Sequence, residues 1–237
     1  MRALLTGATA AGIWAAAAAP ALPRAVDAPP AAHVPAYTGV VEGVVRLGSA
    51  DRAAPAMLSP YARRRYSPPA AAAKASGSAA DIVVYLLVDG DVPAAPTKTA
   101  SIAQRNLTIA PHVTAVQVGT RIDFPNEDNV FHNIFSLSST HPFNLGRYPR
   151  GESRSQVFRK PGVVRMFCDI HSDMSGVILV LDTPYFTSPD ASGRFRLTGV
   201  PEGRHRLVAW HESAGADTAT VVVGANGTVT ADLSLPR

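Results

Sequence analysis

The sequence predicts an all-β protein, and three observations favour this fold class. The chain of 237 residues contains 20 prolines and 18 glycines, which suits many turns and few long helices. Outside the N-terminal stretch its apolar residues lack a helical period; they form short runs or alternate with polar residues, as strands do. Turn signals such as Asp89-Gly90 and Asn226-Gly227 separate these runs. With 46% hydrophobic residues, the chain can bury one large core or two small ones.

The N-terminal stretch has the pattern of an export signal. Arg2 is a short positive region, residues 3–19 are an apolar run rich in alanine, and Ala19-Pro20-Ala21 offers an Ala-x-Ala cleavage site. An uncleaved membrane anchor is the alternative, but this run is weakly hydrophobic and at the lower length limit of a bilayer span. We therefore expect residues 1–21 to be a cleaved signal peptide. The mature chain would then be periplasmic or otherwise exported, with no membrane span.

The next part of the chain combines two strand-like runs with segments of low complexity. Residues 22–37, rich in proline and alanine, are expected to form a disordered leader. Strands are predicted at 38–47 and 81–88, the second as a short run of β-branched and aliphatic residues. Between them, residues 49–80 are expected to be a long mobile loop. Its Tyr-Ala-Arg-Arg-Arg-Tyr motif (61–66) fits a solvated basic loop, or a docking patch for an acidic partner.

The middle of the chain predicts several short strands in succession. Three are expected within 102–124, where Leu107 and Ile109 alternate with polar neighbours. A polar loop follows at 126–129, and 138–151 is expected to be a loop. Further strands are predicted at 133–137, 153–158, 163–168 and 176–181. In the strand 163–168, Cys168 shares a face with Val164 and Met166, so its side chain is expected to point into the interior.

The strongest functional signal is the octapeptide Phe-Cys-Asp-Ile-His-Ser-Asp-Met at 167–174, in which Cys168, His171 and Met174 have the spacing Cys-x2-His-x2-Met. A thiolate, an imidazole and a thioether can converge on one metal ion if this segment folds as a tight loop. His132 supplies a second imidazole, and two histidines, one cysteine and a weak axial methionine form the ligand set of a blue-copper centre. Met174 also fits a plain core position. Cys168 is the single cysteine, which excludes an intramolecular disulfide, and metal ligation would explain a free thiol in an exported protein.

These residues resemble the cupredoxin family, and its plastocyanin and amicyanin members in particular. The resemblance covers residues 102–181 and includes Gly-Thr-Arg-Ile-Asp-Phe (119–124), Asn-Glu-Asp (126–128), His132-Asn133 and Pro161-Gly162. It implies a Greek-key sandwich that binds one copper ion, which cycles between Cu(I) and Cu(II).

The same resemblance implies roles for residues beside the ligands. Asn133 would bridge the two loops that carry the ligands and help position the thiolate. Phe131 and Phe167 are either apolar packing around the site or ordinary core aromatics. Where the family often has proline before the loop histidine, this chain has Ile170.

The C-terminal part resembles a second family. The motif Asp-x-x-Gly-Arg-Phe (190–195), the turn Val-Pro-Glu-Gly (200–203) and a terminal alternating strand are similar to the carboxypeptidase regulatory-like domain, a smaller transthyretin-like or Ig-like β-sandwich. We expect a discontinuous domain made of residues 38–90 plus 184–237, with the copper domain (98–183) inserted between its parts. In the competing interpretation, strands 40–47 and 81–88 belong to the cupredoxin sandwich.

Together these features predict a periplasmic mononuclear blue-copper (type 1) protein that carries single electrons between redox protein partners, with His171 as the electron exit. The alternatives are a copper carrier or chaperone, and a non-catalytic interaction module with a structural metal. No catalytic constellation is apparent, so we do not expect an enzyme. The net charge of +4 comes from scattered arginines, and nucleic-acid binding is not expected. Proteins that resemble this pairing of domains are sometimes labelled as methylamine-utilisation proteins, but no substrate-handling residue here supports that label. The partners and the oligomeric state do not follow from the sequence.

Overall fold

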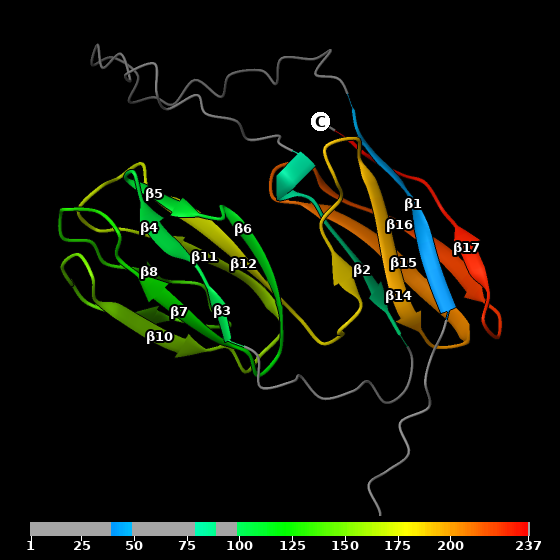
Figure 1. Ribbon diagram of the computed structural model, residues 1–237, viewed down its shortest axis with the longest axis horizontal. Coiled ribbons are helices and arrows are strands. Elements are labelled where there is room, and N and C mark those ends of the chain that lie inside the picture. Colours follow the sequence, from blue (N-terminus) through cyan, green and yellow to red (C-terminus); the bar gives the residue numbers. More distant parts are fainter. Residues whose placement is uncertain (1–38, 49–78, 89–98, 237) are drawn as a thin grey trace, which may run out of the picture. The chain divides into compact units, whose positions relative to one another are not determined.

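The computed structural model describes residues 39–48, 79–88 and 99–236, and within these ranges the chain is all-β (Figure 1). One short 3-10 turn, η2 (Ala79–Asp81), precedes a strand. In the described part of the chain, no helix has the length and apolar character needed to cross a bilayer. The predicted signal peptide, the leader and the motif at 61–66 lie outside the described residues, as does nearly all of the predicted loop at 49–80.

The strands that carry the candidate site form two sheets and a hairpin, drawn mainly in green in Figure 1. The three-stranded sheet has the order β10 (Ser153–Val157), β7 (Arg121–Pro125), β3 (Thr99–Ser101). The five-stranded sheet has the order β6 (Val113–Gln117), β12 (Ser175–Leu181), β11 (Gly162–Phe167), β8 (Phe135–Ser136), β9 (Phe143–Asn144). The hairpin pairs β4 (Ala103–Arg105) with β5 (Thr108–Ala110). Both sheets are mixed, because β3 runs parallel to β7 and β6 runs parallel to β12.

The side-chain pattern explains this arrangement. In β11, Val164 and Met166 are buried whereas Arg165 and Phe167 are exposed, which gives the strand one core face. The neighbouring strand β12 is buried along nearly its whole length, as expected for a continuous apolar run in the middle of a sheet. Residues of both sheets form one core cluster, which contains Cys168 and Met174. The predicted inward direction of Cys168 is therefore confirmed, and this side chain is 5% exposed.

The remaining strands form a second sandwich. One sheet has the order β14 (Arg194–Val200), β1 (Gly39–Leu47), β17 (Thr228–Thr230), and β18 (Leu233–Leu235) also pairs with β1. The other has the order β13 (Phe186–Thr187), β2 (Val83–Leu87), β15 (Gly203–His211), β16 (Gly215–Val223). Val41 of β1 and Leu207 of β15 belong to the same core cluster and are both 0% exposed, so the two sheets pack their apolar faces together.

The register of β1 and β2 shows how the ends of the chain combine. β1 is antiparallel to β14 and parallel to β17 and β18, and β2 lies between β13 and β15. Within the described residues, neither strand pairs with a strand of the site-bearing sandwich. Strand pairing thus links two early strands to the last part of the chain across more than 100 intervening residues. Figure 1 shows blue β1 flanked by orange β14 and red β17.

Some local predictions need correction. The segment 102–124 contains four strands, β4 to β7, where three were predicted, because Asn106 and Leu107 form a two-residue turn. Both have a positive φ, 55° and 56°, as a tight hairpin of two residues requires. Leu107 is therefore a turn residue that is 50% exposed, and not an inward strand position. Strand β9 lies in the predicted loop 138–151, and β13 was not predicted.

Candidate metal centre

The loop that carries Cys168, His171 and Met174 is the connection of the β11–β12 hairpin. Phe167 pairs with Ser175, so the seven residues between them must turn within a short distance. The amide of Cys168 donates to the carbonyl of Met174 over 3.2 Å, and the amide of Met174 donates to the carbonyl of His171 over 3.1 Å. These two bonds close the loop and hold the backbones of Cys168, His171 and Met174 close together.

His132 reaches this loop from the neighbouring part of the five-stranded sheet. Phe135 of β8 pairs with Phe167 of β11, which brings the segment before β8 beside the end of β11. His132 forms a backbone bridge with Tyr148: its amide donates over 3.2 Å and its carbonyl accepts over 2.9 Å. Its side chain is 0% exposed. These backbone bonds therefore hold His132 in place independently of the contacts of its ring.

The three donor atoms converge on one point. Nδ1 of His132 lies 3.1 Å from Nδ1 of His171, and Sγ of Cys168 lies 3.8 Å from the same Nδ1 of His171. One ligand atom from each residue lies within 4.8 Å of the others. Bonds of about 2.0 Å to nitrogen and 2.3 Å to sulfur, as in zinc sites, would put neighbouring ligand atoms about 3.3 to 3.8 Å apart. Two of the observed separations, 3.1 and 3.8 Å, are close to this range, and the whole set lies within 4.8 Å, so the donor atoms approach the spacing that one first-row metal ion requires. Thiolate with imidazole favours copper or zinc over calcium or magnesium.

Met174 is buried in the core at the end of the loop that carries Cys168 and His171. The side chain is 1% exposed and packs in the same core cluster as Cys168 and Met166. Its carbonyl accepts the Cys168 amide, so the residue is held at the neck of the loop. Axial ligation by its thioether remains a prediction, and the core position is compatible with it.

The side chain of Asn133 connects the two segments that carry the ligands. Its Oδ1 accepts the amide of Asp169 over 2.8 Å, and its Nδ2 donates to Oδ1 of Asn144 over 3.2 Å. Asn133 is 1% exposed, so these bonds replace the hydrogen bonds to water that its side-chain amide loses on burial. The contact is the one expected of a residue that fixes Cys168 relative to His132.

The two phenylalanines near the site lie at its surface. Phe131 is 57% exposed and Phe167 is 37% exposed, so neither is an ordinary core aromatic. Phe167 stacks in a tilted geometry on Phe135, with ring centroids 5.9 Å apart. Val130 and Ile170, which also adjoin ligand-bearing segments, are 44% and 39% exposed. An apolar rim, defined by Val130, Phe131, Phe167 and Ile170, therefore flanks the candidate ligands in sequence and is open to solvent.

The structure adds a carboxylate that sequence reasoning did not assign to the site. Oδ2 of Asp128 lies 2.9 Å from Nε2 of His132, the ring nitrogen that faces away from the cluster. Burial raises the pKa of Asp128, but hydrogen bonds from the Leu107 amide, the His132 ring and the Asn106 amide outweigh it and lower the pKa below its ordinary value. An ionised carboxylate can only accept hydrogen bonds, so His132 donates from Nε2. The spacing Asp-x3-His in a polar loop was the available signal.

A buried polar group beneath His132 was also missed. The hydroxyl of Tyr148 donates to the carbonyl of Phe124 over 2.9 Å and accepts a bond from Nε2 of Gln104. Burial raises the pKa of Tyr148 to about 12, so the phenol stays neutral. Asn126 donates from Nδ2 to the carbonyls of Val130 and Tyr148 over 2.8 and 3.0 Å. The phenol of Tyr148, whose backbone bridges to His132, therefore both donates and accepts a hydrogen bond.

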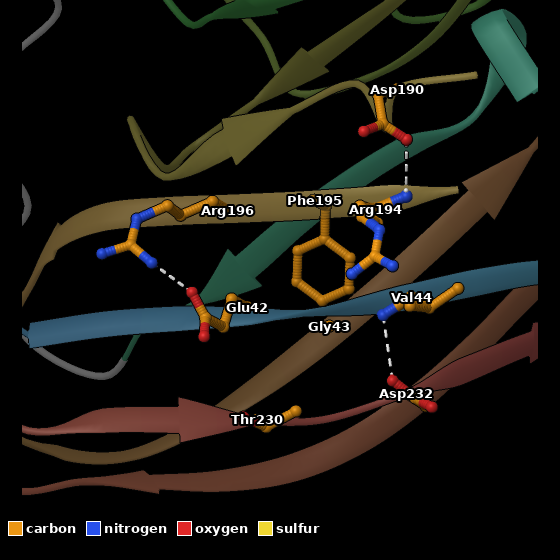
Figure 2. Close-up of a pocket in the computed structure, with 9 residues that line it drawn as sticks. All are labelled: Glu42, Gly43, Val44, Asp190, Arg194, Phe195, Arg196, Thr230 and Asp232. Atoms are coloured by element: carbon orange, nitrogen blue, oxygen red, sulfur yellow. Dashed lines mark hydrogen bonds and ion pairs between the residues drawn. The ribbon is translucent and has the colours of Figure 1, made fainter. Parts of the chain in front are cut away.

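A second concentration of polar side chains lies in the other sandwich, and we call it the carboxylate groove (Figure 2). Glu42 pairs with Arg196, and Asp232 accepts the Val44 amide over 2.9 Å. Oδ1 of Asp190 accepts the amide of Arg194 over 2.9 Å. The groove is lined by Glu42, Gly43, Val44, Asp190, Arg194, Phe195, Arg196, Thr230 and Asp232. Each of its carboxylates already has a partner within the chain, so these bonds explain the cluster without a ligand.

The other described histidines do not join the candidate site. His112 contacts the Ser175 carbonyl, His141 accepts the Arg159 amide, and His205 contacts the Pro201 carbonyl. Nδ1 of His211 accepts bonds from the turn that follows it. Across residues 39–48, 79–88 and 99–236, the group of His132, Cys168 and His171 is the one set of three or more such side chains with metal-binding proximity.

Comparisons with known proteins find structural neighbours for part of the chain. No family model matches the chain, and no curated protein matches it. A purple cupredoxin from Nitrosopumilus maritimus is 26% identical with a TM-score of 0.32, over 35% of this chain and 99% of that one. A copper-containing nitrite reductase from Thermus scotoductus is 26% identical with a TM-score of 0.35, over 40% of this chain and 25% of that one. A variant of amicyanin in its Cu(I) form is 14% identical with a TM-score of 0.34, over 41% of this chain and 99% of that one. Because these scores are low, we infer the site from its own geometry.

Proposed function

We propose that this chain is a mononuclear copper protein that carries single electrons between redox partners. The observation that carries the proposal is the convergence of Cys168, His132 and His171, with ligand atoms within 4.8 Å of one another at one end of a β-sandwich. Two imidazoles, one thiolate and a nearby methionine are the ligand set of a type 1 centre. Copper bound there would supply a one-electron couple, Cu(I)/Cu(II).

The protein's contribution is to hold the ligands still. Cys168 follows directly on β11, and His132 is fixed by its backbone bridge to Tyr148. Asn133 ties the second segment to the first through the Asp169 amide. A site whose ligands move little can change oxidation state with little rearrangement, because the same geometry must serve both states.

The partner surface is proposed to be the apolar rim. Of the three clustered ligands, His171 is partly exposed, whereas His132 and Cys168 are buried. Ile170 precedes His171 and is 39% exposed, so the most accessible ligand adjoins apolar surface. Electrons would enter and leave through His171 when a redox protein covers this rim.

The wider organisation is part of the same proposal. The copper domain, residues 98–183, would be inserted into a discontinuous carboxypeptidase regulatory-like sandwich made of residues 38–90 plus 184–237. The pairing of β1 and β2 with C-terminal strands supports this division. A signal peptide at 1–21 would export the protein to the periplasm.

The test is to replace the thiolate. Copper(II) bound to Cys168 should give an intense visible band, and Cys168→Ala should abolish it while far-UV circular dichroism of the copper-free protein is unchanged. A band retained in Cys168→Ala would overturn the site. Repeated reduction and reoxidation without loss of copper supports electron transfer. Release of copper on reduction would instead support a copper carrier, and a band that never bleaches would support a structural metal.

A further inference from the structure

The two ring nitrogens of His132 have different partners. Nδ1 faces His171 over 3.1 Å, while Nε2 faces Oδ2 of Asp128 over 2.9 Å. The His132 side chain is 0% exposed and that of Asp128 is 15% exposed, so water competes little for this bond. A neutral imidazole carries one proton, and a carboxylate acceptor at Nε2 places it there. Nδ1 is then left with a free lone pair.

Asp128 is itself held by the turn between β4 and β5. Its Oδ1 accepts the Asn106 amide over 2.6 Å, and its Oδ2 accepts the Leu107 amide over 2.8 Å. Both amides belong to the two-residue turn, and successive N–H groups in a turn can together bind an anionic group. The amide of Asp128 donates to Oδ1 of Asn126 over 3.0 Å, which fixes the backbone as well.

We propose that Asp128 is a positioning residue that selects the Nε2–H tautomer of His132, and that the Asn106–Leu107 turn is the support that keeps Asp128 in place. The metal-free ring is thereby presented with its Nδ1 lone pair toward Cys168 and His171. A carboxylate on the far nitrogen also makes an imidazole a stronger donor. The stronger donation to a metal rests on the proposed function, whereas the choice of tautomer can be observed in the metal-free protein.

The first arm of the test uses copper-free protein. Nitrogen-15 NMR of labelled histidine rings, at a pH where the rings are neutral, reports which nitrogen of His132 carries the proton. Wild type and Glu127→Gln should show the Nε2–H form. Glu127 is a matched control, because it adjoins Asp128 and carries the same charge but pairs with Arg105. Asp128→Ala should introduce the Nδ1–H form. A ring that stays purely Nε2–H in Asp128→Ala would overturn the proposal.

The second arm measures copper(II) affinity and reduction potential by competition titration and voltammetry. Loss of an outer partner of a ligand lowers metal affinity by about 10- to 100-fold, so Asp128→Ala should fall in that range while Glu127→Gln stays near wild type. If Cu(I) affinity is unchanged, each tenfold loss raises the potential by about 59 mV. Equal changes of affinity and potential in Asp128→Ala and Glu127→Gln would show that the loss of one negative charge is sufficient to explain them, and would overturn the positioning role.

Two further outcomes are separable. Should Asp128→Ala fail to fold, Asp128→Asn keeps the shape of the side chain and removes its charge. It should change the His132 tautomer, the copper(II) affinity and the reduction potential in the same directions, but by smaller amounts. A protein without any copper–thiolate band would refute the proposed function, and the ring NMR would still decide the role of Asp128.

Discussion

The candidate metal centre and the carboxylate groove are both dense clusters of polar side chains, but they differ in which polar atoms remain unpaired. In the groove, Glu42 forms an ion pair with Arg196, and Asp232 forms one with Arg46 and accepts a hydrogen bond from the Val44 amide. In the metal centre, the hydrogen bond to Asp128 occupies the outer nitrogen of His132 and turns the inner one toward Cys168 and His171. Donor atoms that face one another are the arrangement expected of a ligand site, whereas the carboxylates of the groove are already paired within the chain.

The largest expected difference is in copper binding. His171→Ala should remove the intense visible band and lower copper(II) affinity by more than the roughly 10- to 100-fold expected for an outer partner. Asp232→Ala in the carboxylate groove should leave both unchanged and reduce the free energy of unfolding by about 1 kcal/mol, because the Val44 amide loses its acceptor. Competition titration with a chromophoric chelator measures the first effect. Equal affinity losses in both variants would contradict the distinction between the two clusters.

The next comparison sets the two cores against each other. Ile122 lies in the core beside the metal centre and Ile82 in the core of the other sandwich, with exposures of 0% and 1%. Each change to alanine should cost about 2 to 5 kcal/mol through the cavity it leaves. If the sandwiches unfold separately, Ile122→Ala should lower the denaturant midpoint of one of two transitions. Bound copper should raise the midpoint of that same transition alone, because a ligand stabilises the unit that binds it. Denaturant titrations followed by circular dichroism, with and without copper, test this division. A single transition that copper and both variants shift together would contradict it.

A smaller effect is expected where the two ligand-bearing segments are joined. Asn133→Ala should lower the free energy of unfolding by about 1 to 3 kcal/mol, because the Asp169 amide loses its acceptor at a buried position. It should also broaden the copper–thiolate band. Asn144→Ala is the control, since it removes the other partner of Asn133 and spares the Asp169 bond. Urea titration and absorption spectra measure both. A band of unchanged shape in Asn133→Ala would show that the bridge does not position Cys168.

The smallest effect concerns a histidine outside both clusters. Burial lowers the pKa of His141, and the charge of Lys160 lowers it further. Nε2 of His141 accepts the Arg159 amide over 2.9 Å, a bond that requires the neutral ring. The unfolded chain then binds more protons than the folded one as the pH falls below about 6.5, so stability should decrease in that range down to the lowered pKa of the folded state. Unfolding free energies of wild type and His141→Gln between neutral and mildly acidic pH measure this. The same slope in both would contradict it.

Sequence reasoning grouped the candidate ligands most directly where they belong to one short loop. The spacing of Cys168, His171 and Met174 is set by one hairpin connection, and the loop is closed as a tight turn. Asn133 was found by resemblance, and its bond to Asp169 agrees with the bridging role. Asp128 was missed because the contact with His132 depends on the path of an irregular loop, which no periodic pattern describes.

The fold class was predictable for the same reason, whereas the register between distant strands was not. Alternation in β14 and the continuous apolar run of β12 indicate strands from neighbouring residues alone. Parallel pairing of β1 with β17 joins opposite ends of the chain, and its register depends on how two whole sheets pack. The turn at Asn106 and Leu107 was missed because its second residue is leucine, where a hairpin turn usually has glycine.

The most direct measurement is the visible absorption spectrum of the copper(II)-loaded protein before reduction, after reduction and after reoxidation. Cys168 as a close ligand, with His132 and His171, predicts an intense band that disappears on reduction and returns on reoxidation without loss of copper. A protein that binds copper but remains pale would show that Cys168 is not a short-range ligand, and would contradict the account of this site as a one-electron carrier.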